Sequence, residues 1–308
     1  MRFFDLHCDT PYRIYRENLD FCDMRLDVRA ENFREFENFV QVSAIWSDSK
    51  RVGEKNYSDF FKIRENYLSQ LKKYGINLCL KVPDICNTAP KAILAVEGAS
   101  LVCKDISRLS VLYSSGVRVL TPLWRGENHI GGGYDTQTGL TSFGKSLVRE
   151  CERLGIIIDV SHMSERSFWD TAEITEKPFA ATHSNSKSVC CHPRNLTDEQ
   201  FCAIVKRGGI VGINFYPPHV CKNYQSENFD GYIESLCKNI NRFLDMGGEN
   251  NIALGADRDG FERYDGYSQT EYSVRLYDAL LKQTDKKTTD DIFFSNAMRF
   301  FKKSLPAE

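Results

Sequence analysis

The chain has 308 residues, of which 42% are hydrophobic and 27% are charged. These proportions are typical of a soluble globular protein and exclude a mostly disordered or collagen-like chain. Lys and Arg number 40 against 42 Asp and Glu, a formal net charge of −2. Composition therefore gives no basic footprint for nucleic acid or for an anionic membrane surface. Only six histidines occur, so the position of each one is informative.

The start of the chain and its cysteines bear on the compartment. No basic segment followed by a long apolar run opens the chain, and no run of 18 apolar residues occurs in it. We therefore expect neither a secretory signal nor a membrane span. The 11 cysteines are scattered without a CxxC motif, which is typical of reduced thiols and predicts a cytoplasmic protein.

Short apolar segments alternate with helical patterns along most of the chain. Strands are predicted at residues 2–7, 39–46, 92–97, 117–124, 155–160, 178–183, 209–215 and 252–257. Helices are predicted at residues 57–74, 104–115, 142–154, 163–175, 196–207, 229–247 and 288–304. This alternation favours a parallel sheet covered by helices, and eight strands favour a TIM (β/α)8 barrel formed by residues 1–308 as one domain. An open doubly wound sheet is the alternative, although no GxGxxG follows the first strand.

Polar residues that suit a metal site follow several of the predicted strands. In a barrel of this type, catalytic groups lie at the C-terminal ends of the strands. The residues found there are His7, Asp9, Glu97, Trp124, Asp159, His162, His183 and Asp257. Carboxylates and imidazoles that converge on one rim are the ligands that a divalent metal requires.

The segment DLHCD at residues 5–9 alternates polar and apolar residues. Residues two apart on a strand face the same way, so its polar residues are predicted to point into the barrel and its apolar residues to pack on helices. A buried charge is costly unless it is paired or bound to metal. His7 and Asp9 can thus supply one nitrogen and one oxygen to the same cation. The alternative is a capping aspartate beside a hydrogen-bonded core histidine.

Glu97 follows five apolar residues, and its two oxygens could bridge two cations or pair with a basic residue at the rim. His162 and His183 follow apolar strands beside hydroxyl residues that can orient an imidazole, although either could be a satisfied buried histidine. Asp257 could be a ligand or a general base beside a metal-bound water. Two metals, a bridging carboxylate and a hydroxide predict hydrolysis of an amide or ester. No GxSxG motif occurs, which disfavours acyl-enzyme chemistry.

The motifs DLHCDTP, AVEGA, GIIIDVSHMS, THSNSKSVCCHPRNLTDEQ, GGIVGINFYP and GADRDGF occur in this order. With them the chain resembles the renal (membrane) dipeptidase family, the zinc dipeptidases of peptidase family M19, over nearly its whole length and in a bacterial-type form. The resemblance implies a TIM barrel of the metal-dependent hydrolase type with two zinc ions. It implies that His7 and Asp9 hold one zinc, that His162 and His183 hold the other, and that Glu97 bridges them.

The resemblance also implies roles in substrate binding and catalysis. Asp257 matches the acidic residue that exchanges a proton with the leaving amine, and Arg194 matches the arginine that binds the C-terminal carboxylate of the substrate. Trp124 stands where animal members carry a histidine that steadies the tetrahedral intermediate. An indole cannot replace an imidazole as a charged donor. Either Trp124 only shapes the pocket, or His129 or Arg125 supplies the donor.

Two further features are predicted at the mouth of the barrel. Tyr216 and His219, after the seventh strand, are predicted to line the pocket. The glycine run 131–133 is predicted to form a mobile rim rather than an anion cradle, because it lacks the lysine and the strand context of a phosphate loop.

Together these observations predict a zinc-dependent metallodipeptidase that acts through a hydroxide bridging the two metals. One alternative is another binuclear-metal hydrolase of this barrel type, acting on amides, lactams or phosphoesters. The other is a non-catalytic barrel that binds a small ligand, although five buried ligand candidates without a metal would be destabilising. The expected partner is a dipeptide substrate rather than nucleic acid or membrane. From the resemblance alone we also expect a homodimer.

Overall fold

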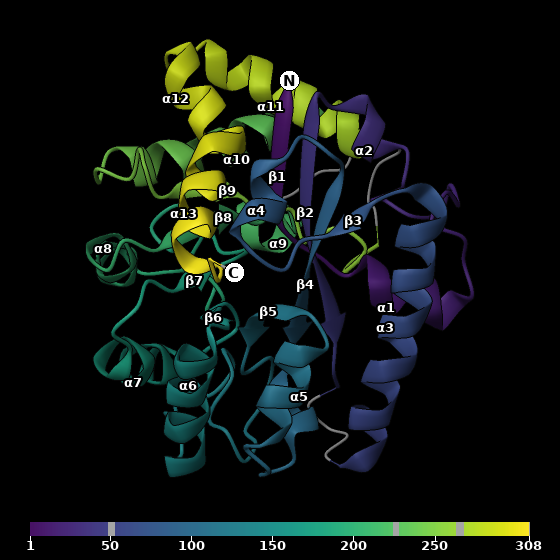
Figure 1. Cartoon of the computed structure of the whole chain (residues 1–308). Helices are drawn as coiled ribbons and strands as arrows, with labels where there is room; N and C mark the ends of the chain where they lie inside the picture. Colours follow the sequence, from purple (N-terminus) through teal and green to yellow (C-terminus); the bar gives the residue numbers. More distant parts are fainter. Residues whose placement is uncertain (49–52, 224–227, 263–267, 308) are drawn as a thin grey trace.

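A computed structural model describes residues 1–48, 53–223, 228–262 and 268–307. Eight parallel strands pair in the order β6-β5-β4-β2-β1-β9-β8-β7, with helices around them (Figure 1). Their bounds are β1 (Arg2–Cys8), β2 (Asn38–Trp46), β4 (Lys91–Glu97), β5 (Val117–Thr121), β6 (Ile157–Ile158), β7 (Ala180–Ala181), β8 (Ile210–Ile213) and β9 (Ile252–Leu254). All eight predicted strands are present, and a further two-residue strand, β3 (Asn77–Leu78), pairs with β4 outside this order.

The two ends of this order, β6 and β7, meet through a short contact. Asp159 and Ala180 form a parallel bridge, and the backbone N–H of Val160 donates to the carbonyl of Ala180 at 2.7 Å. The sheet is therefore a nearly closed barrel of parallel strands with helical connections, which confirms the predicted TIM barrel.

Thirteen α-helices are described. They are α1 (Thr10–Glu17), α2 (Asn32–Glu35), α3 (Glu54–Tyr74), α4 (Val82–Cys86), α5 (Arg108–Ser114), α6 (Ser142–Leu154), α7 (Glu165–Ile174), α8 (Asp198–Lys206), α9 (Pro217–Val220), α10 (Phe229–Leu244), α11 (Gln269–Leu281), α12 (Lys286–Asp290) and α13 (Asn296–Ser304). None of these helices is long and apolar enough to cross a membrane.

Sequence reasoning missed α1, α2, α4, α9 and α11. For α11 a signal was present: the Ser268 hydroxyl accepts a hydrogen bond from the N–H of Glu271, and the Glu271 carboxylate accepts one from the N–H of Ser268. This reciprocal capping box is readable as S-x-x-E. For α1, Pro11 in the first turn was a second readable signal.

The predicted helix at residues 288–304 begins earlier and is interrupted. Asp285 caps α12, and a π-helical turn at Asp291–Ser295 joins α12 to α13. In this turn Phe293 packs with the helices around the barrel, while Phe294 packs with residues inside it. The wider turn thus allows two successive phenylalanines to enter two different cores.

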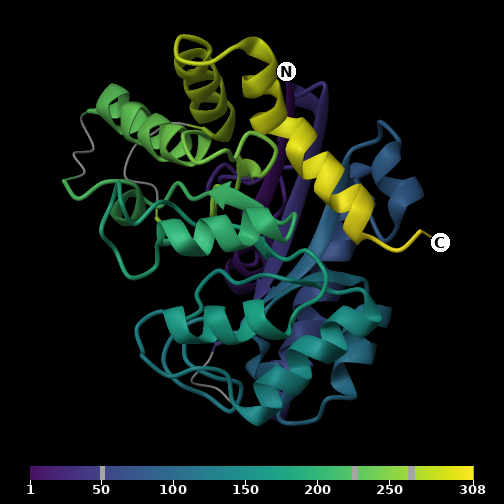
Figure 2. The same ribbon diagram turned by 90° about the vertical axis from the view of Figure 1, so that its left-hand side faces the viewer.

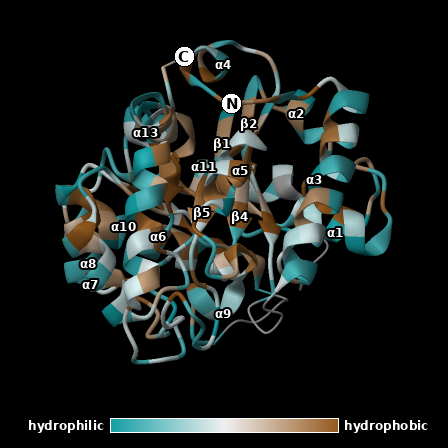
Figure 3. Cartoon of the chain, turned by 60° about the horizontal axis from the view of Figure 1, so that its bottom comes forward, coloured by the Kyte–Doolittle hydropathy of each residue, from teal (hydrophilic) through white to brown (hydrophobic). Residues whose placement is uncertain are grey.

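Side chains of the strands divide into an inner and an outer core. The inner core joins the N-terminal half of the barrel strands to α13. Its members include Phe4, Leu6, Val40, Ile93, Val119, Ile157, Ala180, Ile210, Ala253, Phe294 and Phe301. The outer core joins the other strand faces to the surrounding helices. Figure 2 shows α13, in yellow, running from near the N-terminus to the C-terminus. Figure 3 shows the hydrophobic residues turned inward and the hydrophilic ones outward on the helices.

The strict alternation predicted for β1 is wrong. Phe4 and Leu6 lie in the inner core, where Phe4 stacks on Phe301 of α13, instead of packing on the helices around the barrel. Asp5 pairs with Gln41 and Cys8 pairs with Ser43, so β1 advances three residues while β2 advances two. This irregularity breaks the period of two. Because of this irregularity, polar side chains reach the rim at the C-terminal end of β1, while the earlier residues of β1 fill the barrel.

Candidate active site and metal centre

The side chains predicted as metal ligands converge at the C-terminal ends of the strands. Glu97, the last residue of β4, is central among them. Its Oε1 lies 2.8 Å from Nε2 of His162 and 3.5 Å from Nε2 of His183. Its Oε2 lies 3.9 Å from Nε2 of His7, which in turn lies 3.7 Å from Oδ2 of Asp9. The two oxygens of one carboxylate thus face two different sets of ligands.

These contacts define two neighbouring groups of potential ligand atoms. The atoms of Glu97, His162 and His183 lie within 4.8 Å of one another, and so do those of His7, Asp9 and Glu97. Glu97 belongs to both groups, which is the arrangement expected of a carboxylate that bridges two cations. The five residues predicted as ligands are therefore brought together.

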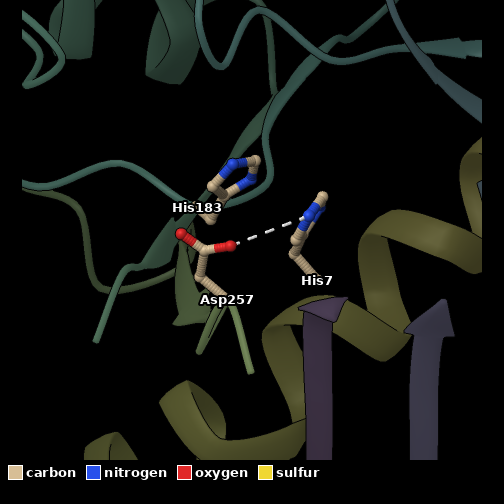
Figure 4. A group of neighbouring side chains, drawn as sticks. All are labelled: His7, His183 and Asp257. Atoms are coloured by element: carbon tan, nitrogen blue, oxygen red, sulfur yellow. Dashed lines mark ion pairs between the residues drawn. The ribbon is translucent and has the colours of Figure 1, made fainter. Parts of the chain in front are cut away.

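A third group joins His7 and His183 to Asp257, whose Oδ1 lies 3.9 Å from Nε2 of His7 (Figure 4). The other carboxylate oxygen, Oδ2, accepts a hydrogen bond from Nδ2 of Asn214 at 3.0 Å. Asp257 has a left-handed backbone with φ of 60°, as has His162 with φ of 67°. Such values are strained for residues other than glycine and gather at functional sites. Asp257 is thus held in a constrained backbone conformation with its Oδ1 facing the cluster.

Burial and charge show that this cluster suits a cation. His7, Glu97 and His183 are each at most 2% exposed, and Nε2 of His7 and Oδ1 of Asp9 have no hydrogen-bond partner among the described residues. Burial raises the pKa of Glu97 well above its usual value, and the charge of Asp9 raises it further. Burial lowers the pKa of His7, but the carboxylates of Glu97 and Asp9 outweigh this and raise it to about 10. Crowded carboxylates of this kind are stabilised by bound metal.

The other two histidines have the protonation state that ligands need. Burial lowers the pKa of His162 and of His183 well below the usual value. Both rings are therefore neutral near pH 7, and neutral imidazole is a common ligand of zinc. Their Nε2 atoms lie 2.9 Å apart, so both point at the same place.

Asp159 orients the ring of His183 through the hydroxyl group of Thr182. The Thr182 hydroxyl donates to Oδ2 of Asp159 at 2.6 Å and lies 2.8 Å from Nδ1 of His183. Because its single proton goes to Asp159, this hydroxyl accepts from the N–H at Nδ1. The lone pair of His183 is thereby directed from Nε2 toward Glu97. Sequence reasoning named Asp159 only as a polar residue at a strand end, and its position two residues before the SH motif was the available signal.

A cavity of about 550 Å³ opens over the cluster. Its wall includes Asp9, Tyr12, Arg16, Trp46, Glu97, Trp124, Tyr134, His162, Tyr216, His219, Asp257 and Phe261. The structure thus places the predicted pocket residues Trp124, Tyr216 and His219 at the cavity. It places His129 elsewhere: that ring packs against Phe143, with centroids 5.4 Å apart, and is not among the residues lining the cavity.

Arg194 lies beside the cluster and is 4% exposed. Its Nη1 donates to the Ser184 hydroxyl and its Nη2 donates to the carbonyl of His183, both at 2.8 Å. Its Nε has no hydrogen-bond partner, and no carboxylate of the described residues forms an ion pair with it. A smaller hollow of about 70 Å³ is lined by Arg194, and His162 lines both this hollow and the cavity. A buried guanidinium that no described carboxylate contacts is suited to bind the carboxylate of a substrate.

The glycine run 131–133, predicted to be a mobile rim, is instead packed and hydrogen-bonded. The N–H of Gly133 donates to the carbonyl of Gly126 at 2.8 Å, and the N–H of Ser164 donates to the carbonyl of Gly132 at 3.1 Å. A Cβ on Gly133 would lie 2.8 Å from the backbone oxygen of Trp124. Only glycine fits so close an approach.

This packed loop delivers Tyr134, a residue that sequence reasoning missed. Tyr134 lines both the main cavity and the hollow that holds Arg194, and its ring centroid lies 5.9 Å from that of His162. The only sequence signal for Tyr134 was its position directly after three glycines.

Arg125, which the sequence offers as a donor near Trp124, pairs instead with Asp135 at 3.3 Å.

Comparisons with known proteins identify the family of the chain and support its fold. The model of the membrane dipeptidase family (peptidase family M19) matches residues 1–306. A protein encoded in the pqqA 5′ region of Klebsiella pneumoniae is 34% identical over 240 residues, which cover 74% of this chain and 88% of that protein. Among solved structures, a dipeptidase of family M19 has a TM-score of 0.88 at 24% identity and covers 99% of this chain and 98% of its own. A metallopeptidase from Rhodobacter sphaeroides, liganded with a phosphinate mimic of the dipeptide L-Ala-D-Ala, has a TM-score of 0.87 at 23% identity over 99% of each chain. The chain therefore belongs to the membrane dipeptidase family, peptidase family M19.

Proposed function

We propose that this metallodipeptidase uses two zinc ions per chain, held by His7 and Asp9 on one side, by His162 and His183 on the other, and by Glu97 between them. The observation that carries the proposal is that the two oxygens of Glu97 face two separate groups of ligand atoms. A mixed set of imidazoles and carboxylates suits zinc. When bound, zinc polarises a carbonyl and makes hydroxide available near pH 7.

The chain itself binds and orients the dipeptide. Arg194 receives the C-terminal carboxylate, because it is buried beside the cluster and has unused N–H donors. A substrate site that ends at such a cation selects for a free C-terminus close to the scissile bond and so favours dipeptides over longer chains. Trp124 and Tyr216 shape the wall of the cavity. His129, whose ring packs on Phe143, takes no part in the proposed binding or catalysis.

Proton transfer is assigned to Asp257 and stabilisation of the intermediate to Tyr134. Asp257 Oδ1 faces the cluster while Asn214 holds its other oxygen, so it can accept a proton from the attacking water and return it to the leaving amine. The Tyr134 hydroxyl is a neutral donor on the wall between the cluster and Arg194. It can donate to the oxygen on which charge develops.

The proposal is tested by metal analysis together with a peptide panel. We expect about two zinc ions per chain, release of alanine from L-Ala-L-Ala and L-Ala-D-Ala, far slower cleavage of Ala-Ala-Ala, and loss of activity in chelator that zinc restores. Glu97→Ala and His183→Ala should abolish turnover. A protein that holds no transition metal near neutral pH, or that hydrolyses only phosphoesters, would refute the proposal.

A further inference from the structure

Three aromatic side chains form one wall of the cavity over the metal cluster. Tyr12 comes from α1, Trp46 ends β2, and Trp124 follows β5. The Tyr12 and Trp46 rings pack edge to face at 5.1 Å between centroids, and so do those of Trp46 and Trp124. All three are half-buried and line the cavity. Since β4 lies between β2 and β5, this aromatic wall stands beside Glu97.

Trp46, the middle residue of the aromatic wall, and Arg194 lie on opposite sides of the barrel. Arg194 follows β7, and Trp46 ends β2. In the circular strand order, β4, β5 and β6 separate β2 from β7 on one side, and β1, β9 and β8 separate them on the other. The metal cluster at the strand ends lies between the two.

This placement fixes the direction of a bound dipeptide. With its carboxylate at Arg194 and its peptide carbonyl at the cluster, the rest of the substrate extends away from β7 and toward β2. Two extended residues span at most about 7 Å, so the N-terminal residue is the only part that reaches the far side. Its side chain then lies against Trp46 and its two aromatic neighbours.

We propose that this aromatic wall is the subsite for the side chain of the N-terminal residue and that the enzyme prefers dipeptides beginning with a large apolar residue. The inference rests on the proposed function and goes beyond it by naming the substrate class. Aromatic rings provide large apolar contact areas, and burying a large apolar side chain is favourable. The residues Tyr12, Arg16 and Trp46 also line an adjoining hollow of about 240 Å³, which gives a large side chain room.

The charge at this wall is already balanced. Arg16 lies over the Tyr12 ring, 5.6 Å from its centroid, and its Nη2 pairs with Oε1 of Glu17 at 2.6 Å. Its charge is thus compensated within α1, and an acidic side chain would have to displace that contact. Tyr216 and Phe261, with centroids 5.1 Å apart, lie after β8 and β9 and are not part of this wall.

The test compares kcat/KM of the zinc-loaded enzyme for Phe-Gly, Leu-Gly, Gly-Phe, Glu-Gly and Gly-Gly. We expect Phe-Gly and Leu-Gly to exceed Gly-Gly by about tenfold or more, with a smaller gain for Gly-Phe and none for Glu-Gly. Trp46→Ala should lower the ratio of Phe-Gly to Gly-Gly by about tenfold, while Trp46→Phe, which keeps a ring, should largely retain it. Trp169→Ala, on the outer surface of α7, should change neither activity nor the ratio.

The outcomes separate this inference from the proposed function. If the zinc-loaded enzyme hydrolyses all five dipeptides without preference, prefers Glu-Gly, gains as much from Gly-Phe as from Phe-Gly, or keeps its ratio in Trp46→Ala, the subsite is wrong although the dipeptidase stands. If no dipeptide is hydrolysed and no zinc is bound, the proposed function itself fails. The zinc content of each variant is measured beside its kinetics. A content equal to that of the wild type would show that Trp46→Ala retains a folded site.

Discussion

At the scale of single residues, the site depends on how each ligand is oriented as much as on which ligands are present. His183 points its Nε2 at Glu97 because Thr182 and Asp159 occupy its other side. We predict that Asp159→Asn, which removes the negative charge from this chain of hydrogen bonds, lowers zinc affinity and activity about 10- to 100-fold. Zinc retained after dialysis against a weak chelator measures the effect. Asp170→Asn is the matched control, because Asp170 is also buried but holds the N–H of Leu140 far from the cluster.

The Asp159 prediction fails if the variant holds zinc as tightly as the wild type while both variants are folded. An equal loss of zinc in Asp170→Asn would also contradict it, because the effect would then be one of stability alone. Both variants change a buried aspartate, but only Asp159 is connected to His183.

A second residue-scale prediction concerns Tyr134. Removing its hydroxyl in Tyr134→Phe keeps the ring on the cavity wall but removes the donor assigned to the developing charge. We expect kcat to fall about 10²-fold with little change in KM, since the interaction forms only in the transition state. Steady-state kinetics on one dipeptide measure the split. Tyr113→Phe, on α5 and outside the residues that line the cavity and its adjoining hollow, should leave both constants unchanged, and a fall confined to KM in Tyr134→Phe would refute the assignment.

At the scale of elements, the glycine loop shows how backbone packing builds the site. A Cβ at Gly133 would lie 2.8 Å from the backbone oxygen of Trp124, and a backbone atom cannot move aside as a flexible side chain can. We predict that Gly133→Ala displaces Tyr134 and lowers both kcat and the melting temperature. Gly155→Ala is the control, because Gly155 has a φ of 82° and no atom within 4 Å of the added Cβ. It should cost about 1 kcal/mol of stability and leave the kinetics unchanged.

Elements also show what the sequence could predict. Short apolar runs that alternate with helical patterns predict the strands, and the polar residues that follow these runs predict Glu97, His162 and His183 at the site. Periodicity could not predict the irregularity between Asp5 and Cys8 in β1, because a bulge depends on pairing with a distant strand. Nor could it predict that His162 has a left-handed backbone. Such conformations are imposed by the surrounding structure.

At the same scale, loop residues were harder to place than strand residues. Asp257 comes three residues after the end of β9, so its position at the rim follows from the fold. His129 lies in a loop whose path is set by local hydrogen bonds: the Thr141 hydroxyl donates to its carbonyl at 2.7 Å, and its ring turns to Phe143. Counting residues from the strand end could not reveal that turn. The resemblance to the family implies a set of ligands but leaves the donor near Trp124 open.

At the scale of the whole molecule, the metal cluster links catalysis to stability. Glu97, Asp9 and Asp257 place three carboxylates in one buried region, and Asp9 and Asp257 each raise the pKa of Glu97. Without cations these like charges oppose folding, whereas bound zinc stabilises the folded state by about 4 kcal/mol at a free concentration 1,000 times the dissociation constant. We therefore predict that chelator lowers the melting temperature of the wild type by roughly 5–10 °C.

The same reasoning predicts a crossing between wild type and Glu97→Gln, which removes one ionisable carboxyl group and one proposed bridging ligand from the crowded cluster. In zinc the wild type should melt at the higher temperature, because it binds metal more tightly. In chelator the order should reverse, because the raised pKa of buried Glu97 means that near pH 7 it must either take up a proton or repel Asp9 and Asp257, whereas Gln does neither. Glu173→Gln, on α7 away from the cluster, should follow the wild type in both conditions. Melting curves in zinc and in chelator measure both orders. A wild type whose melting temperature is unchanged after verified loss of its metal would show that the cluster is stable without cations, and the carboxylates would then need another explanation for being buried together.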